Sequence, residues 1–218
     1  MKKAVVLLSG GLDSTTALFW AKSRGWRCEA LAVRYGQRHV RELRAARAVA
    51  KAAKTPLHEV SLDLPWLKTS SLVDSRRALP DIPLPKIGRG GVPSTYVPGR
   101  NTIFLALAAS LADAVGAQAV VIGANALDYS GYPDCRPEYL RAFERAARRG
   151  TRARGLKILA PLLRLSKRGI VELAGKVKAP LRLTWSCYAG GARPCGKCDS
   201  CKLRAKGFAE AGRVDEAL

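Results

Sequence analysis

The 218-residue sequence lacks long apolar runs and is poor in acidic residues. No stretch reaches the roughly 18 consecutive apolar residues that a membrane-spanning helix requires. Met1, Lys2 and Lys3 lead directly into five apolar residues, which is shorter than the hydrophobic core of a secretion signal. We therefore expect a cytoplasmic protein with no membrane partner. The length suits one main domain with a substantial core and a small appended module.

The shortage of acidic residues makes the chain strongly basic. There are 38 Lys and Arg residues against 17 Asp and Glu residues, which gives a formal net charge of +21. Between Arg141 and Arg182, thirteen basic residues accompany two Glu, so we expect a positive field over one region of the surface. RNA is one possible partner of such a field. No basic stretch is interleaved with the aromatic residues on which single strands stack, however, and the same field attracts ATP, so nucleic acid is not required.

The sequence also lacks the two common phosphate-binding patterns, Gly-x-Gly-x-x-Gly and a glycine-rich loop that ends in Gly-Lys-Ser/Thr. Instead, apolar residues 4–8 lead into Ser9-Gly-Gly-Leu-Asp-Ser14 and then into a helical pattern. Paired glycines allow a close backbone approach, and Asp13, Ser14 or Thr15 can cap the helix. Free amides at a helix start favour an anion, so this loop is a candidate phosphate site. An ordinary capped turn would also fit these residues.

Short apolar runs alternate with helical patterns along the chain, which is typical of a parallel sheet covered by helices on both faces. We expect a doubly wound, Rossmann-like α/β fold with the glycine loop at the carboxyl edge of the sheet, where such folds bind ligands. The expected strands lie at residues 4–8, 29–35, 57–62, 119–123 and 157–160. The expected helices lie at residues 13–24, 38–53, 102–115 and 137–149, with a further basic helix from Lys167.

Residues 63–100 interrupt this alternation, because they contain six of the twelve prolines and four glycines. A connection of this length is usually a functional lid or a disordered insert, and we interpret it as a partly mobile lid. Its end brings Arg100 and Asn101 to a helix start, which is a suitable place to meet a phosphate or a carboxylate. Asn101 as a simple helix cap beside a solvated Arg100 is the alternative interpretation.

Four of the six cysteines lie near the C-terminus, namely Cys187, Cys195, Cys198 and Cys201. Two-residue gaps between thiolates are typical of knuckles that hold one tetrahedral zinc ion. Four thiolates leave no open position, so we expect a structural ion. We expect a nucleotide-binding domain at residues 1–180 and a zinc module with a terminal helix at 181–218. An iron–sulfur cluster is the alternative, whereas disulfides would not persist in the cytosol.

A loop rich in Asp and Tyr follows the strand expected at residues 119–123 and would share the ligand edge of the sheet. Asp128 or Asp134 could accept hydrogen bonds from a guanine-like ring, on which Tyr129 or Tyr132 could stack. The same carboxylates could bind magnesium beside the phosphates of ATP. A plain, turn-rich surface loop would fit the composition as well.

Six motifs occur in order along nearly the whole chain. They are Ser9-Gly-Gly-Leu-Asp-Ser14, Tyr35-Gly-Gln-Arg-His39, Val97-Pro-Gly-Arg-Asn101, Asp128-Tyr-Ser-Gly-Tyr-Pro-Asp-Cys-Arg136, Thr184-Trp-Ser-Cys-Tyr188 and Cys195-Gly-Lys-Cys-Asp-Ser-Cys201. The first resembles the pyrophosphate loop of the adenine nucleotide α-hydrolase-like superfamily. The set as a whole resembles the 7-cyano-7-deazaguanine synthase (preQ0 synthase) family of queuosine biosynthesis. The lid region matches that family least.

The resemblance implies an ATP- and Mg²⁺-dependent conversion of 7-carboxy-7-deazaguanine and ammonia into the nitrile preQ0, through adenylated carboxylate and amide intermediates. The residues that it implies for nucleotide binding are Leu8, Ser9, Gly10, Gly11, Leu12, Asp13, Ser14 and Thr15. Those implied for catalysis are Ser9, Asp13, Ser14, Arg100 and Lys167, although an exposed Lys167 is an alternative. Those implied for substrate binding are Arg100, Asn101, Asp128, Tyr129, Tyr132, Asp134 and Arg136.

The motifs leave some alternative interpretations open. Ammonia can attack an acyl adenylate directly, so Cys135 is not assigned as a nucleophile. The runner-up function is a tRNA-modifying enzyme with the same loop, a thiolase or a lysidine-type ligase, because a basic surface would suit tRNA. A zinc-knuckle adaptor without enzymatic activity is disfavoured by the intact loop chemistry. We expect a homodimer.

Overall fold

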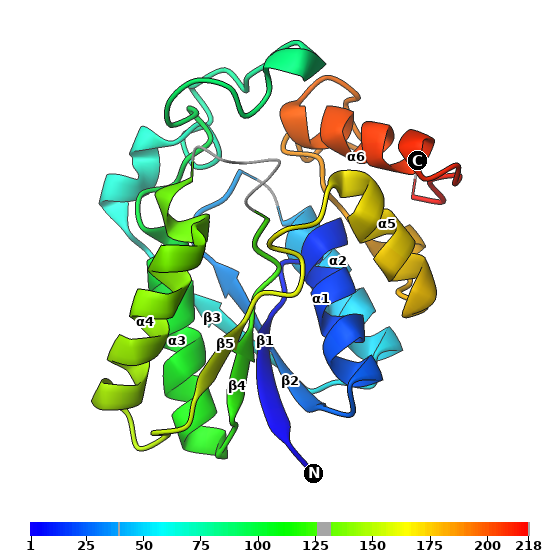
Figure 1. The fold of residues 1–218 in the computed structure, drawn as a ribbon. Helices are drawn as coiled ribbons and strands as arrows, with labels where there is room; N and C mark the ends of the chain where they lie inside the picture. Colours follow the sequence, from blue (N-terminus) through cyan, green and yellow to red (C-terminus); the bar gives the residue numbers. More distant parts are fainter. Residues whose placement is uncertain (39, 126–131, 218) are drawn as a thin grey trace.

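The computed structural model describes residues 1–38, 40–125 and 132–217. Its centre is a five-stranded parallel sheet with the strand order β3-β2-β1-β4-β5 (Figure 1). The strands are β1 (Lys3–Leu7), β2 (Arg27–Arg34), β3 (Leu57–Ser61), β4 (Ala119–Val121) and β5 (Lys157–Leu159). The five strands expected from the sequence are therefore confirmed, with ends that differ by at most two residues.

Helices cover both faces of the sheet. They are α1 (Leu12–Ser23), α2 (Arg41–Ala52), α3 (Arg100–Val115), α4 (Pro137–Gly150), α5 (Lys167–Lys176) and α6 (Asp199–Glu210). Helices α3 and α4 lie on one face, while α1, α2 and α5 lie on the other, and α6 packs on α5 beyond the end of the sheet (Figure 1). This arrangement confirms the doubly wound α/β fold.

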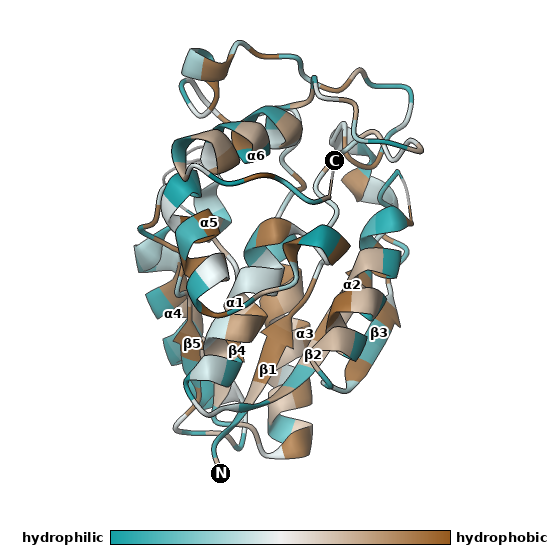
Figure 2. Ribbon diagram, turned by 90° about the vertical axis from the view of Figure 1, so that its right-hand side faces the viewer, coloured by the Kyte–Doolittle hydropathy of each residue, from teal (hydrophilic) through white to brown (hydrophobic). Residues whose placement is uncertain are grey.

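The strands contribute to two separate cores because successive side chains of a strand point to opposite faces of the sheet. On β1, Ala4 and Val6 join the core beneath α1 and α2, whereas Val5 and Leu7 join the core beneath α3. Val5 and Val6 have no exposed surface, and such burial stabilises the fold by about 1.5–3 kcal/mol for each side chain. Figure 2 shows hydrophobic strands between helices whose outer surfaces are more hydrophilic.

The start of α1 differs from the prediction. Gly11 is the N-cap and no side chain caps the helix, so the expectation that Asp13, Ser14 or Thr15 would cap it is wrong. These residues lie inside the first turn instead. The Ser14 hydroxyl binds back to the preceding loop, donating to the carbonyl oxygen of Gly11 at 3.3 Å.

The start of α3 also differs from the prediction, which placed it at residue 102. Gly99 has φ 61° in the left-handed region that glycine tolerates best, and the helix begins at the next residue. Arg100 and Asn101 are therefore the first two helical residues. Helix α2 begins at Arg41, three residues later than expected.

Residues 63–100 carry two short 3₁₀ helices, η1 (Pro65–Thr69) and η2 (Leu84–Lys86), before α3 begins. The segment reaches α6, where the Asp81 carboxylate pairs with Lys202 and the Ile82 N–H donates to Asp199 Oδ1 at 3.4 Å. Across the ranges given above, no helix is both long enough and apolar enough to span a membrane.

Candidate active site

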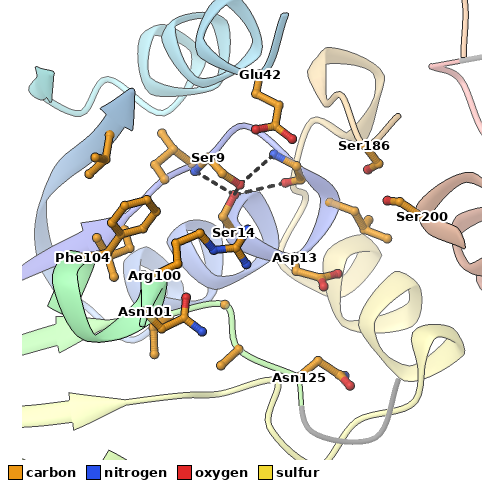
Figure 3. A pocket seen from close by; sticks show the side chains of 18 of the residues that line it. Ser9, Asp13, Ser14, Glu42, Arg100, Asn101, Phe104, Asn125, Ser186 and Ser200 are labelled. Atoms are coloured by element: carbon orange, nitrogen blue, oxygen red, sulfur yellow. Dashed lines mark hydrogen bonds between the residues drawn. The ribbon is translucent and has the colours of Figure 1, made fainter. Parts of the chain in front are cut away.

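A cleft of about 240 Å³ opens at the carboxyl ends of β1, β2 and β4. The loop that follows β1 and the first turns of α1, α2, α3 and α5 line it, together with Trp185 and Ser186 of the C-terminal segment (Figure 3). Parallel α/β sheets bind ligands at this edge because the loops and helix N-termini converge there. The cleft therefore lies where the sequence predicted a ligand.

The loop at residues 9–14 is organised around the Ser14 hydroxyl. Ser14 Oγ lies 3.0 Å from Ser9 Oγ and accepts a hydrogen bond from the Ser9 backbone N–H at 3.2 Å (Figure 3). The Gly11 N–H donates to Ser9 Oγ at 3.4 Å. These contacts fold the loop into a compact turn at the start of α1, beside the helix amides that favour an anion.

Two glycines allow other backbone segments to pack against this loop. A Cβ atom at Gly10, which has φ +83°, would lie 2.4 Å from the backbone nitrogen of Ala46 and 2.5 Å from the carbonyl oxygen of Glu42. A Cβ atom at Gly123 would lie 2.9 Å from the backbone nitrogen of Ser14. Gly10 does not line the cleft, and the backbone that it approaches closely is that of α2.

The pair Asp13–Lys167 joins the first turn of α1 to the first turn of α5. Lys167 Nζ lies 3.1 and 3.0 Å from the two carboxylate oxygens of Asp13, and Lys167 is 6% exposed. The Ser166 hydroxyl caps α5 by accepting the Gly169 N–H at 3.2 Å. Lys167 is therefore a buried residue of the cleft wall, and the alternative of an exposed lysine does not hold.

Arg100 enters the cleft from α3 beside two phenols. Its Nη1 donates to the Tyr35 hydroxyl at 3.5 Å, and the Tyr132 hydroxyl hydrogen-bonds to Thr95 Oγ1 at 2.7 Å. Burial raises the pKa of both tyrosines, and the charge of Arg100 offsets this only in part. Both side chains therefore stay protonated near neutral pH.

Asn101 and Cys135 line the cleft, whereas Asp134 lies behind them. The Asp134 carboxylate accepts the Asn101 backbone N–H at 2.9 Å, and Asn101 Nδ2 donates to Cys135 Sγ at 3.2 Å. Burial, with the nearby Asp134 charge, raises the pKa of the Cys135 thiol to about 11. Asp134 thus satisfies an orphan amide in the first turn of α3, and Cys135 is a thiol at neutral pH.

The structure brings only some of the predicted substrate-binding residues to the cleft. Arg136 is exposed and, like Asp134, is not part of the cleft lining. Thr15 of the predicted nucleotide-binding residues is fully buried and also lies off the lining. Asp128 and Tyr129 lie outside the described residues.

Several residues of the cleft lining were not predicted as site residues, among them Glu42, Trp185 and Arg204. The Trp185 backbone N–H donates to the Gly10 carbonyl oxygen at 2.9 Å, which ties the C-terminal segment to the glycine loop. Glu42 follows the Tyr35-Gly-Gln-Arg-His39 motif by three residues. A signal for Trp185 was therefore present in the sequence, because it lies in the Thr184-Trp-Ser-Cys-Tyr188 motif, whereas Glu42 lies outside the motifs that the resemblance includes.

The four C-terminal cysteines meet in one cluster. The sulfur atoms of Cys187, Cys195, Cys198 and Cys201 lie within 4.8 Å of one another. Zinc–sulfur bonds of about 2.3 Å in a tetrahedron place sulfur atoms about 3.8 Å apart, so the donor set fits that geometry with small adjustments. Cys187 Sγ also accepts the N–H groups of Cys195 at 3.3 Å and Ala189 at 3.4 Å, which suits a thiolate. The cluster could therefore hold a metal ion.

Comparisons with known proteins agree with the motifs. The family described as queuosine biosynthesis protein QueC matches residues 3–212. A 7-cyano-7-deazaguanine synthase from Synechococcus sp. (strain RCC307) is 50% identical over 218 residues, covering 98% of this chain and 97% of that protein. One from Thermoplasma volcanium is also 50% identical over 218 residues, covering 98% and 89%.

Solved structures share the fold at low sequence identity. A predicted subunit of tRNA methyltransferase from Methanocaldococcus jannaschii has a TM-score of 0.52 at 15% identity, covering 100% of this chain and 92% of that chain. NMN synthetase from Francisella tularensis has a TM-score of 0.51 at 15% identity, covering 98% and 78%. At this level of identity, the two structures show only that the fold is shared. The near-complete family match and the relatives at 50% identity show that the chain belongs to the queuosine biosynthesis protein QueC family.

Proposed function

We propose that the protein converts 7-carboxy-7-deazaguanine and ammonia into 7-cyano-7-deazaguanine at the expense of ATP, as a ligase that forms carbon–nitrogen bonds. Membership of the family and the names of the relatives support this activity. The observation that carries the proposal is that one cleft joins the glycine loop to Arg100, Asn101 and Tyr132. A nucleotide on the loop would therefore face a substrate held on α3.

The proposed chemistry begins with a carboxylate, which is a poor electrophile because its oxygen is a poor leaving group. Transfer of AMP to that oxygen supplies a good leaving group and releases pyrophosphate into the loop at residues 9–14. Cations in the cleft wall stabilise negative charge that grows at the α-phosphate, and the buried Lys167 and the partly exposed Arg100 are the cations that we assign to this role. Ser9, Ser14 and Asp13 act by shaping the loop and by holding Lys167.

We assign substrate binding to the cleft wall opposite the loop. Asn101 presents its amide there, and Asp134 acts by holding Asn101. Tyr132 contributes an aromatic surface on which a deazaguanine could pack. Roles for Asp128, Tyr129 and Arg136 stay predictions from the family resemblance.

We also propose that the cysteine cluster holds one structural zinc ion, because four thiolates leave no position open for chemistry. Magnesium would enter the cleft with ATP. The remaining proposals are a cytoplasmic homodimer, a nucleotide-binding domain at residues 1–180 with a lid at 63–100, and a zinc module at 181–218.

The test is incubation of the purified protein with 7-carboxy-7-deazaguanine, ammonium and ATP-Mg²⁺, followed by mass spectrometry. We expect the nitrile, AMP and pyrophosphate. Formation of ADP and phosphate alone would contradict cleavage between the α and β phosphates. Salt-sensitive binding and modification of tRNA, without any reaction of the free acid, would favour the tRNA-modifying alternative.

A further inference from the structure

Two carboxylates line the cleft within the described residues, and they differ in their surroundings. Asp13 is paired with Lys167, so its charge is balanced. The Glu42 carboxylate makes no hydrogen bond or ion pair with any other described residue, although it lies in the cleft wall and is only partly exposed. An unpaired, partly buried carboxylate costs stability, which points to a use in the cleft.

The position of Glu42 is fixed by the packing of α2 on the glycine loop. Gly10 approaches the Glu42 carbonyl so closely that a Cβ atom on that glycine would lie 2.5 Å from its oxygen. The Glu42 side chain extends from α2 toward the Ser9–Ser14 pair (Figure 3). A reacting group above the loop would therefore have this carboxylate beside it.

The electrostatic surroundings of Glu42 suit proton transfer. Burial raises the pKa of Glu42 to about 7, and the charge of Arg100 on α3 opposes this shift. The Tyr35 phenol faces the same region from the end of β2, while Asp13, Lys167 and Arg204 line other walls of the cleft. A carboxylate that titrates near the working pH combines a useful ionised fraction with enough basicity to accept a proton.

The proposed reaction, on which this inference rests, removes every proton from one nitrogen. Ammonium loses a proton, and the lone pair of ammonia then forms a C–N bond with the adenylated carboxyl carbon. The C–O bond to AMP breaks, AMP leaves with the electron pair, and a second proton leaves nitrogen to give the amide. After a second ATP adenylates the amide oxygen, nitrogen loses its last two protons as the C–O bond breaks and the triple bond forms.

We propose that Glu42 is the general base that accepts these protons, and that its carboxylate holds the ammonium ion before attack. No other carboxylate in the described cleft wall lacks a cationic partner. Because Glu42 is partly exposed, it can pass each proton to solvent before the next transfer. The same carboxylate then accepts the protons of nitrogen both in amide formation and in nitrile formation.

The test compares Glu42→Gln, which keeps the shape but cannot accept a proton, with Glu59→Gln, which alters a carboxylate outside the cleft. Exchange of pyrophosphate into ATP in the presence of 7-carboxy-7-deazaguanine reports adenylation alone. We expect Glu42→Gln to retain this exchange and to lose at least about 100-fold in nitrile formation, whereas Glu59→Gln retains both. Hydroxylamine is a weaker base that is largely neutral at neutral pH, so hydroxamate formation should fall much less than nitrile formation.

Two further results address folding and proton transfer. Glu42→Asp keeps a carboxylate and should recover part of the nitrile formation. Nitrile formation by the wild-type protein should fall below about pH 7, as Glu42 becomes protonated. The residual activity of Glu42→Gln should not show this fall, because the variant has no carboxylate to protonate at this position.

Unchanged nitrile formation in Glu42→Gln would overturn the inference. Parallel loss of exchange and nitrile formation would also overturn it, because Glu42 would then bind substrate, for example at the ring N–H groups. If the wild-type protein showed no exchange of pyrophosphate into ATP in the presence of 7-carboxy-7-deazaguanine, this would contradict the proposed function itself.

Discussion

Lys167 Nζ contacts both carboxylate oxygens of Asp13, at 3.0 and 3.1 Å, although the two residues are 154 positions apart in the sequence. The contact fixes a positive charge at the wall of the cleft, close to the loop that begins α1. The Lys167 side chain is 7% exposed, so solvent screens this charge far less than it would at the surface.

Lys167→Met should reduce the exchange of pyrophosphate into ATP in the presence of 7-carboxy-7-deazaguanine by about 100- to 1,000-fold, because it removes a buried cation that the proposed adenylation uses. The substitution also leaves Asp13 without its partner, which should lower the free energy of unfolding by about 1–3 kcal/mol. Lys176→Met, at the exposed far end of α5, is the control and should change neither quantity. Normal exchange in Lys167→Met would remove Lys167 from the catalytic set.

Gly207→Ala tests how α6 holds Lys167. A Cβ atom at Gly207 would lie 2.5 Å from Lys167 Cγ, so the lysine must move and its contact with Asp13 should weaken. We expect a loss of about 1–3 kcal/mol in the free energy of unfolding and a lower adenylation rate in the protein that remains folded. Gly150→Ala has nothing within 4 Å of its Cβ and is the control. Equal behaviour of the two variants in the exchange assay would contradict this positioning role.

The sheet and the metal cluster were predictable because their signals are local. Apolar runs mark the five strands, and two-residue gaps place three of the four thiolates together. Lys167 was predicted from the family resemblance, but its burial was not, because it depends on Gly207 in another helix. Likewise, no spacing rule shows that Asp134 turns toward the Asn101 amide and away from the cleft.

Helix starts were the least predictable part of the fold. The left-handed Gly99 sets the first turn of α3, and Gly11, which has no side chain to form a cap, precedes α1. Glu42 escaped prediction for a related reason. A glutamate in the first turn of a helix is ordinary in sequence, and only the packing of α2 on Gly10 places it at the cleft.

Removal of the proposed zinc should affect the nucleotide site as well as the C-terminal module. The Trp185 backbone N–H donates to the Gly10 carbonyl oxygen, and the cysteine cluster begins two residues later at Cys187. We expect Cys198→Ser to lose the metal, to lower the melting temperature and to weaken ATP binding measured by calorimetry. Elemental analysis should find one zinc ion per wild-type chain. Tight ATP binding in a metal-free, folded protein would contradict this coupling.

Cys135→Ala should retain turnover. Burial keeps the Cys135 thiol protonated at neutral pH, since its pKa is about 11, and a thiol is a far weaker nucleophile than a thiolate. The variant removes the sulfur that accepts the Asn101 amide, so a modest rise in the KM for the deazaguanine acid is expected. Complete loss of turnover with normal folding would instead assign Cys135 a covalent role.

The raised pKa of Glu42 gives a prediction about stability with a definite sign. A carboxyl group with a pKa of 4.5 when unfolded and about 7 when folded binds protons more tightly in the folded state. Ionisation of Glu42 therefore destabilises the fold. The effect is absent below about pH 4.5, grows between about pH 4.5 and pH 7, and is complete above about pH 7. Glu42→Gln should accordingly raise the free energy of unfolding by up to about 3 kcal/mol at about pH 8, and by little at about pH 4, in urea titrations.

Glu59→Gln is a control of opposite sign in the same titrations. A hydrogen bond from Arg47 lowers the pKa of Glu59, so its ionised form stabilises the fold slightly above the unfolded pKa, and this contribution is lost as the pH falls through the folded pKa. Replacing Glu59 should therefore cost a little stability at neutral pH, where replacing Glu42 increases it. If both variants lost stability at about pH 8, the Glu42 carboxylate would have a stabilising partner in the folded protein. The Glu42 carboxylate could not then be the base, without an ionic partner among the described residues, that the cleft geometry indicates.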